Sequence, residues 1–398
     1  MFKESELDPN VSPSFDYNIG LMVSELERRF ILFLIGGDYE KMFYTLTGGP
    51  ELDDVGGNQQ RLGRVRLEVE ISEAEKRDKI RNKTSDPNYK GMLDFILTQR
   101  LKSHLESSEE LIYNIPELID VLPFLAKMPQ DMKVSTKVIS QLANIPWITP
   151  QIKKLLNNEQ LKNVMQFADG ANLQARIAKI SYPQLIWILP ICLAQEIQER
   201  IHPSLLETYK KVRFYGRVMG GAIGLLVKDC DKVSVAKWKL YALGSLSCIA
   251  MVALLCLVSD ATKELISQQK INLKEPEKHV DKFSVLEKYA FSQDGLREIL
   301  QLEDIIKPSI LDSIKIEGLD PTQYISGFAD EKSPESLAFQ QARAYAFYRQ
   351  LYRTGRIQKH EASLFLRRYK IDKKTLTKLN SIELASIGNH VQIFKDLS

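Results

Sequence analysis

The sequence lacks the short motifs that mark most nucleotide-binding and hydrolytic enzymes. It contains neither a GxGxxG nor a GxxxxGK[ST] loop, so nothing supports a phosphate-cradling turn. It also contains no GxSxG nucleophile elbow. No two of its histidines are spaced three or four residues apart, and the nearest approach to a His-Asp doublet is His279 with Asp281 in a polar loop. We therefore predict no catalytic residue, no metal ligand and no bound cofactor.

Cysteine is scarce as well. The chain has 4 cysteines, none of them in a CxxC pair, and three lie in or beside apolar runs. A reduced cysteine in such a place behaves as a small hydrophobic residue. A reducing compartment fits this usage best. The first ten residues are polar and lack the apolar core of a secretory signal, so we expect a cytoplasmic protein.

The chain carries little net charge, +3 over 398 residues, so its overall charge does not predict a polyanionic partner. A hydrophobic content of 44% and a charged content of 26% are ordinary for a globular protein. The length allows two or three domains of about 150 residues each.

Residues 240–258 form the longest apolar run and carry no charge. A helix that is apolar all round must be buried, either in a protein core or in a bilayer. The run contains Gly244, Ser245 and Ser247, and the helices expected on either side, 213–227 and 283–302, have apolar faces to cover. We predict a central core helix rather than a membrane span.

Helical spacing dominates the rest of the chain, and the sequence predicts an all-α, multi-helical fold. Residues 1–20 read as a loose arm, followed by a helix over 24–35 with a capping box of Ser24 and Glu27. Thr149 is expected to cap a helix that starts at Pro150, and Pro190 to kink or divide its helix. Residues 61–71 alternate as a strand would, or begin a charged helix. The other predicted helices span 92–105, 117–127, 135–143, 150–157, 159–168, 172–180, 182–201, 203–227, 235–258, 263–269, 283–302, 336–354, 359–369 and 373–381.

Two further patterns concern packing around the apolar run. Gly216, Gly220, Gly221 and Gly224 lie on the helix over 213–227, which predicts a close approach to the apolar helix or, as the alternative, a ligand niche. Trp238 lies between two lysines, so we expect it at the surface with its ring partly covered.

The block from 115 to 320 resembles a bacterial signalling module, the HD-related output domain (HDOD) family. The resemblance is carried by four stretches in order: IPEL with VLP at 115–123, the two short helices at 139–156, ISYPQLIWILPICL at 180–193, and YALGSLSCIAMVALL at 241–255. It implies an HD-like helical domain with the apolar helix at its centre.

HD phosphohydrolases, to which this family is related, bind divalent metal through a His, a His-Asp doublet and a distant Asp. Where the doublet would fall, this chain reads GSLSC at 244–248, and where the upstream His would fall it reads RFYGRVMGG at 213–221. A hydroxyl and a small apolar group cannot replace imidazole and carboxylate ligands. The resemblance therefore implies a non-catalytic role in signalling through protein contacts. The alternative is a divergent HD-type metal-dependent phosphohydrolase.

The tail is strongly basic. Residues 341–378 hold eleven Lys and Arg against Glu361 and Asp372, with aromatic residues interleaved. Such a face suits an acidic protein surface or, as the alternative, nucleic acid. A third possibility is docking on the acidic region 275–335 of the same chain. The candidate partner-binding residues are Arg343, Arg349, Tyr352, Arg353, Arg356, Arg367 and Arg368.

The residue patterns predict a cytoplasmic helical protein of three parts, and the resemblance implies that it is a bacterial regulatory protein. A helical N-terminal segment spans 1–112, an HDOD-like domain 113–322, and a basic helical extension 323–398. The oligomeric state and the partner stay open.

Overall fold

A computed structural model describes residues 13–36, 87–106, 115–126, 136–159, 175–177, 180–273, 279–314, 316, 319–325 and 333–381. Within these ranges the chain is helical and forms no strand, although isolated bridge residues occur, such as the antiparallel pair Ile316 and Leu319, so the all-α prediction is confirmed. The helices are α1 (Pro13–Ile35), α4 (Pro87–Glu106), α5 (Pro116–Ala126), α6 (Thr136–Ala143), α7 (Ile148–Leu156), α10 (Tyr182–Arg200), η3 (Pro203–Leu205), α11 (Leu206–Lys228), α12 (Lys237–Ser245), α13 (Ile249–Asn272), α14 (Val280–Glu287), α15 (Gln293–Leu300), α16 (Glu303–Ser313), α17 (Pro321–Ile325), α18 (Pro334–Arg353), α19 (Lys359–Arg368) and α20 (Lys373–Asn380).

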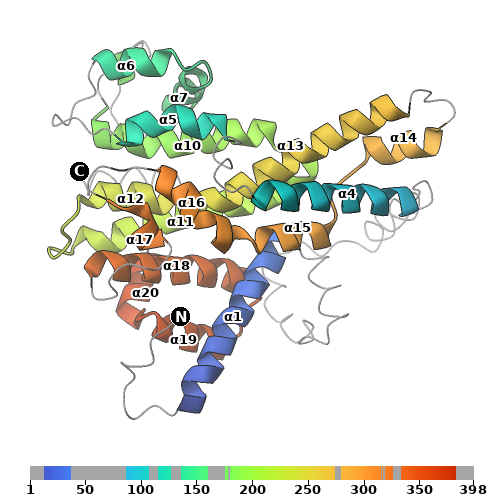
Figure 1. Cartoon of the computed structure of the whole chain (residues 1–398). Helices are drawn as coiled ribbons and strands as arrows, with labels where there is room; N and C mark the ends of the chain where they lie inside the picture. Colours follow the sequence, from blue (N-terminus) through green and yellow to red (C-terminus); the bar gives the residue numbers. More distant parts are fainter. Residues whose placement is uncertain are drawn as a thin grey trace.

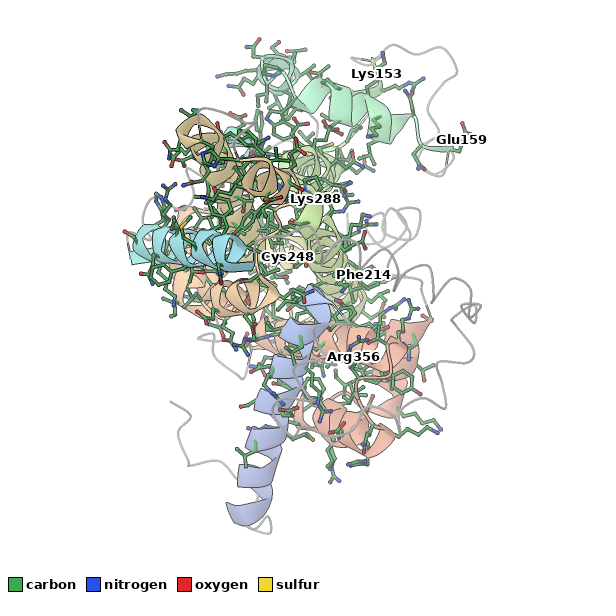
Figure 2. All side chains as sticks on the ribbon, turned by 90° about the vertical axis from the view of Figure 1, so that its right-hand side faces the viewer. Lys153, Glu159, Phe214, Cys248, Lys288 and Arg356 are labelled. Carbon is green, nitrogen blue, oxygen red and sulfur yellow. The ribbon has the colours of Figure 1, made fainter. Side chains whose placement is uncertain are left out.

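Helix α11 lies at the centre of the molecule. It packs closely against α12 and α18, and it also contacts α1, α13, α20 and α10. Figure 1 shows α5, α6, α7 and α10 above this centre and α1 with α18, α19 and α20 below it. The turned view in Figure 2 keeps that order, with Lys153 of α7 near the top, Cys248 at mid-height and Arg356 lower down.

Glycine brings α11 and α12 into near contact of their backbones. A Cβ added to Gly216 would lie 2.5 Å from Sγ of Cys248 and 2.9 Å from the carbonyl oxygen of Ser245. A Cβ added to Gly220 would lie 2.1 Å from Oγ of Ser245. The predicted close approach between the glycine helix and the apolar run is confirmed, because no larger residue fits at these two positions without movement.

The apolar run is not one helix, as the sequence suggested, but two. Helix α12 ends at Ser245, and α13 begins at Ile249 and continues to Asn272, so the separate helix predicted over 263–269 is part of α13. The break lies beside Gly216 of α11. The stretch Lys237–Asn272 is long and apolar enough to cross a membrane, and 94% of its most apolar window is buried inside the structure, as a core helix requires.

Helix α1 joins the tail through an aromatic cluster. The rings of Phe30 and Phe347 stack with centroids 4.1 Å apart, and Tyr215 of α11 lies 5.4 Å from Phe30 and 5.7 Å from Phe347. The predicted loose arm is wrong over its last part, because α1 already begins at Pro13. Ser24 therefore lies inside the helix and caps nothing.

Several predicted helix boundaries also need correction. Helix α7 begins at Ile148 with Trp147 at its N-cap, so Thr149 is not the cap. Pro190 does not divide α10, which runs unbroken from Tyr182 to Arg200. The helix expected over 283–302 is two helices, α14 and α15, because the side chain of Ser292 accepts a hydrogen bond from Gly295 N and starts a new one. Trp238 is buried, with 8% of its surface exposed.

Other predictions fall outside the described residues. These are the choice between strand and helix over 61–71, almost all of the helix over 159–168, and most of the helix over 172–180.

Candidate functional site

A cavity lies between α10, α11 and the junction of α12 with α13. Its volume is about 70 Å³. Most of its wall is apolar. The lining residues are Pro190, Ile191, Leu193, Ala194, Gln195, Ile197, Tyr209, Arg213, Arg217, Tyr241, Ser245, Leu246, Cys248, Ile249 and Val252.

Helix α11 presents two arginines to this cavity. Tyr209, Arg213 and Arg217 follow one another at intervals of four residues, so they share one face of the helix. Nη1 of Arg213 donates a hydrogen bond of 2.7 Å to Oε1 of Gln198, a neutral amide. Burial and the positive charge of Arg213 lower the pKa of Arg217 to about 10, so the Arg217 guanidinium stays charged at neutral pH. None of the described residues that line the cavity is an aspartate or a glutamate.

The other polar groups at the cavity are neutral. Burial raises the pKa of the Cys248 thiol to about 12, so the thiol stays protonated and is a poor nucleophile. Oη of Tyr209 donates to the carbonyl oxygen of Ala194 at 2.6 Å, and burial raises its pKa. Oε1 of Gln195 is buried and accepts no hydrogen bond. The cavity thus combines two fixed positive charges with an apolar wall and neutral polar groups.

The two stretches that correspond to HD metal ligands in the resemblance meet at this cavity. Residues 213–221 contribute Arg213 and Arg217, and residues 244–248 contribute Ser245 and Cys248. In the part of the chain that the structure describes, no group of three or more His, Cys, Asp or Glu side chains could hold a metal ion. Sequence reasoning found the glycines of α11 but missed its two arginines, although their spacing of four residues was visible.

The seven candidate residues of the tail do not form one open face. Tyr352, Arg353, Arg367 and Arg368 are exposed, and Arg356 is half-buried. Arg349, by contrast, is only 5% exposed and points into the protein, where its Nη1 donates to Oη of Tyr345 at 2.8 Å. Arg343 is half-buried.

The inward side of α18 is part of the hydrophobic core. Tyr345 is fully buried, and its hydroxyl donates to the carbonyl oxygen of Leu379 in α20 at 3.0 Å. Nη2 of Arg343 lies 3.4 Å from Oε1 of Glu27 in α1. Burial raises the pKa of the Glu27 carboxyl, and the positive charge of Arg343 opposes this rise. The negative charge of Asp304 in α16 also raises the pKa of Glu27, so this residue of the acidic region 275–335 lies near the pair. The tail thus docks mainly on α11 and α1.

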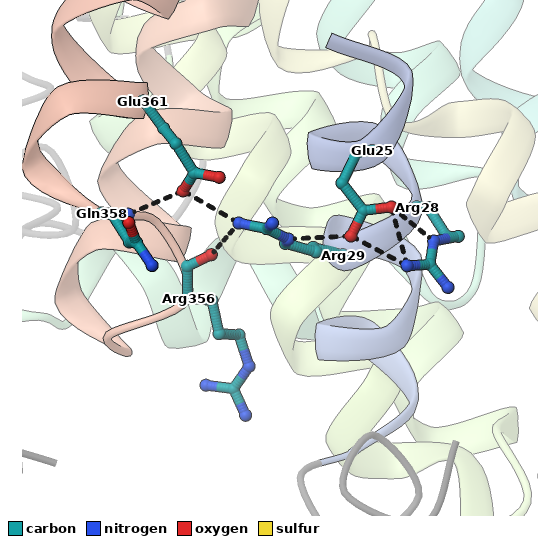
Figure 3. Close-up of polar contacts among 6 residues, drawn as sticks. All are labelled: Glu25, Arg28, Arg29, Arg356, Gln358 and Glu361. Atoms are coloured by element: carbon teal, nitrogen blue, oxygen red, sulfur yellow. Dashed lines mark hydrogen bonds and ion pairs between the residues drawn. The ribbon is translucent and has the colours of Figure 1, made fainter. Parts of the chain in front are cut away.

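A polar clasp holds the turn between α18 and α19 to α1. Nη1 of Arg29 donates to Oε2 of Glu361 at 2.9 Å and to the carbonyl oxygen of Arg356 at 3.3 Å, while its Nε donates to Glu25 (Figure 3). The same Glu361 oxygen accepts from the backbone N–H of Gln358 and so caps α19. Arg356 therefore contributes a backbone oxygen to the clasp.

Comparison of this chain with models of protein families, with curated proteins and with solved structures finds no match. Its function has to be inferred from its own residues.

Proposed function

We propose that the protein is a non-catalytic, cytoplasmic regulator that acts through protein contacts of an HDOD-like domain over residues 113–322. The observation that carries the proposal is the meeting of residues 213–221 and 244–248 at one cavity. An HD phosphohydrolase would hold its metal between such stretches, whereas here they supply Arg213, Arg217, Ser245 and Cys248.

These side chains suit no metal-assisted hydrolysis. Two guanidinium groups repel a divalent cation, and a protonated thiol with a pKa of about 12 neither binds the cation well nor activates water. The cavity therefore supports a binding role better than a hydrolytic one.

The outward side of the tail offers a surface for a partner. Arg353 at the end of α18 and Arg367 and Arg368 at the end of α19 are exposed, as are Lys373 and Lys374 at the start of α20. Exposed charges of one sign favour encounter with a surface of the opposite sign. An acidic protein surface is the partner that we propose.

The first experiment tests the catalytic alternative. Purified full-length protein is analysed for bound transition metal and assayed for hydrolysis of p-nitrophenyl phosphate and of nucleotides with added Mn²⁺ or Mg²⁺. We expect no stoichiometric metal and no hydrolysis above that of a Cys248→Ser control. Stoichiometric metal together with turnover would establish the phosphohydrolase instead.

The second experiment tests the partner surface. The triple variant Arg353→Glu, Arg367→Glu and Arg368→Glu should lose the proteins that the wild-type chain captures from cell extract. The matched control reverses the charge of three lysines on α6 and α7 that are also exposed, Lys137, Lys153 and Lys154. This control should capture the same proteins as the wild type does. Captured material that is released by nuclease would show nucleic acid as the partner.

A deletion of the whole tail would not serve this purpose. It would remove Phe347 from its stack on Phe30 and Tyr345 from the core, so loss of binding would report unfolding. Arg349→Ala is unsuitable for the same reason, since Arg349 is buried.

A further inference from the structure

We propose that a second cavity, between α5, α6 and the turn that leads into α7, binds a small amphipathic cation, an organic ammonium group on an apolar body. Asp120 of α5 pairs with the ammonium group, and apolar side chains of α5, α6 and the turn cover the rest of the ligand. Figure 1 shows these helices at the opposite end of the molecule from α18, α19 and α20. The site is therefore separate from the partner surface of the tail, and its occupation goes beyond the function proposed above.

The size and the wall of this cavity suit a small molecule. Its volume is about 410 Å³, within the range of about 300–1,000 Å³ that is usual for small-molecule sites. Ile119 and Pro123 line it from α5, one helical turn apart. Val138 of α6 and Ile145 of the turn line it as well, and both are only half-buried, as is Ile119. A ligand with an apolar body covers this surface and gains affinity in proportion to the area that it removes from water.

The charge at this cavity is negative, because Asp120 is the one ionisable residue among the described residues that line it. Nε1 of Trp147 donates a hydrogen bond of 2.8 Å to Oδ2 of Asp120 and so fixes the carboxylate at the wall. A carboxylate has about four acceptor sites, so this bond leaves room for a donor on a ligand. In the part of the chain that the structure describes, no basic side chain pairs with Asp120. An ammonium group can supply the counter-charge through a charge-assisted hydrogen bond, which is stronger at a half-buried position than in open water.

Other classes of ligand fit the cavity less well. The carboxylate of Asp120 repels an anion. A neutral apolar molecule would cover the charge of Asp120 without offsetting it, which costs free energy. A divalent metal ion would meet the carboxylate of Asp120 and the amide oxygen of Gln141, fewer oxygen ligands than Ca²⁺ or Mg²⁺ requires. An organic ammonium group needs one carboxylate only, and its apolar body uses the rest of the wall.

Binding is tested by calorimetry on the full-length protein with four probes: octylamine, 1-octanol, octanoate and ethylamine. Both amines are charged at neutral pH, as a lysine side chain is. We expect octylamine to bind at least tenfold more tightly than each of the other three, because it alone combines a positive charge with a long apolar body. Equal binding of 1-octanol or of ethylamine, or no saturable binding of octylamine, would overturn the proposal.

A charge variant assigns the ammonium group to Asp120. Asp120→Asn keeps an oxygen that can accept from Nε1 of Trp147 but removes the negative charge, so it should weaken binding of octylamine at least tenfold. The control is Asp312→Asn in α16, which makes the same change of charge at a carboxylate that also accepts one side-chain hydrogen bond, from Thr322. It should leave binding within twofold of the wild type. If the two variants weaken binding equally, the effect is one of overall charge and the proposal is wrong.

A second variant fills the cavity and leaves its charge in place. Val138→Phe adds a ring at a half-buried position of the wall, where the cavity has room for it, so the melting temperature should hold. We expect binding of octylamine to be lost. Undiminished binding in this folded variant would show that the probe binds elsewhere and would contradict the proposal. Failure of these tests would leave the results on metal, hydrolysis and partner capture untouched, so the two proposals can fail separately.

Discussion

Nη1 of Arg29 lies 2.9 Å from Oε2 of Glu361 and joins the first described helix to the hairpin of the tail. Both side chains are largely shielded from water, with 13% and 15% of their surface exposed. Removing one partner of a shielded ion pair costs more than removing one partner of a pair on the open surface, because the remaining charge is left uncompensated away from water. This clasp ties together elements 332 residues apart in the sequence.

Arg29→Gln should therefore destabilise the protein. Loss of the charge leaves Glu361 poorly compensated, and we expect the free energy of unfolding to fall by about 2 kcal/mol. The measurement is urea denaturation of the single variants Arg29→Gln and Glu361→Gln and of the double variant, which together give the coupling between the two side chains.

Arg28→Gln is the control for this cycle. Arg28 pairs with Glu25 inside the same helix and is more exposed, so its loss should cost about 0.5 kcal/mol. A coupling energy below that value for Arg29 and Glu361 would show that the clasp does not stabilise the fold.

Two glycine substitutions should have opposite effects. Gly216→Ala places a Cβ 2.9 Å from the carbonyl oxygen of Ser245, so the backbones of α11 and α12 must move apart and stability should fall by about 1–3 kcal/mol. Gly91→Ala, at an exposed position of α4, meets nothing within 4 Å and should raise stability by about 0.5–1 kcal/mol through helix propensity. Thermal melting of both variants beside the wild type tests the sign of each effect. Stabilisation by Gly216→Ala would contradict the close approach.

Acid should weaken the contact between α18 and the loop before α12. Burial opposes the ionisation of Glu335. Hydrogen bonds outweigh this effect and hold the pKa of Glu335 below the ordinary 4.5. Two of them reach its Oε1 from Ser234, one from the backbone N at 2.6 Å and one from Oγ at 2.9 Å. Because the folded-state pKa is the lower one, this stabilisation is present above about pH 4.5 and is lost as the pH falls through the folded-state value.

Glu335→Gln reveals this contribution. The urea midpoint of this variant and of the wild type is measured between about pH 6 and 3. The variant should be less stable than the wild type, and the difference between the two midpoints should be largest at pH 6 and shrink on acidification. Glu287→Gln, which changes an exposed carboxylate at the end of α14, serves as the control and should show no such narrowing. A deficit for Glu335→Gln that is constant over this range would exclude the proposed role of its charge.

The packing of α11 on the apolar run could be predicted because its cause is local. Gly216 and Gly220 recur on one helix face, and small residues at that spacing let another helix approach. The break at residues 246–248 could not be predicted, since neither proline nor glycine stands there. It arises where Gly216 meets Cys248 and Ser245, a contact between helices that the sequence does not reveal.

The tail shows a second limit of sequence reasoning. Spacing places Tyr345, Arg349 and Tyr352 near one another on a helix, but it does not say how deep each side chain lies. The count of basic residues favoured an outward face, whereas the structure buries Arg349, whose Nη1 donates a hydrogen bond to the Tyr345 hydroxyl. Tyr352, one turn further on, is 42% exposed. The cavity was missed for a similar reason, since its wall combines residues from helices that are separate in the sequence.

The stacked rings of Phe30 and Phe347 have a consequence for synthesis on the ribosome. At about 5–20 residues per second, roughly half a minute passes between the emergence of one ring and that of the other. During that interval only α11 and α15 are available to cover the apolar stripe of α1, so the newborn protein should remain more sensitive to protease until α18 has emerged.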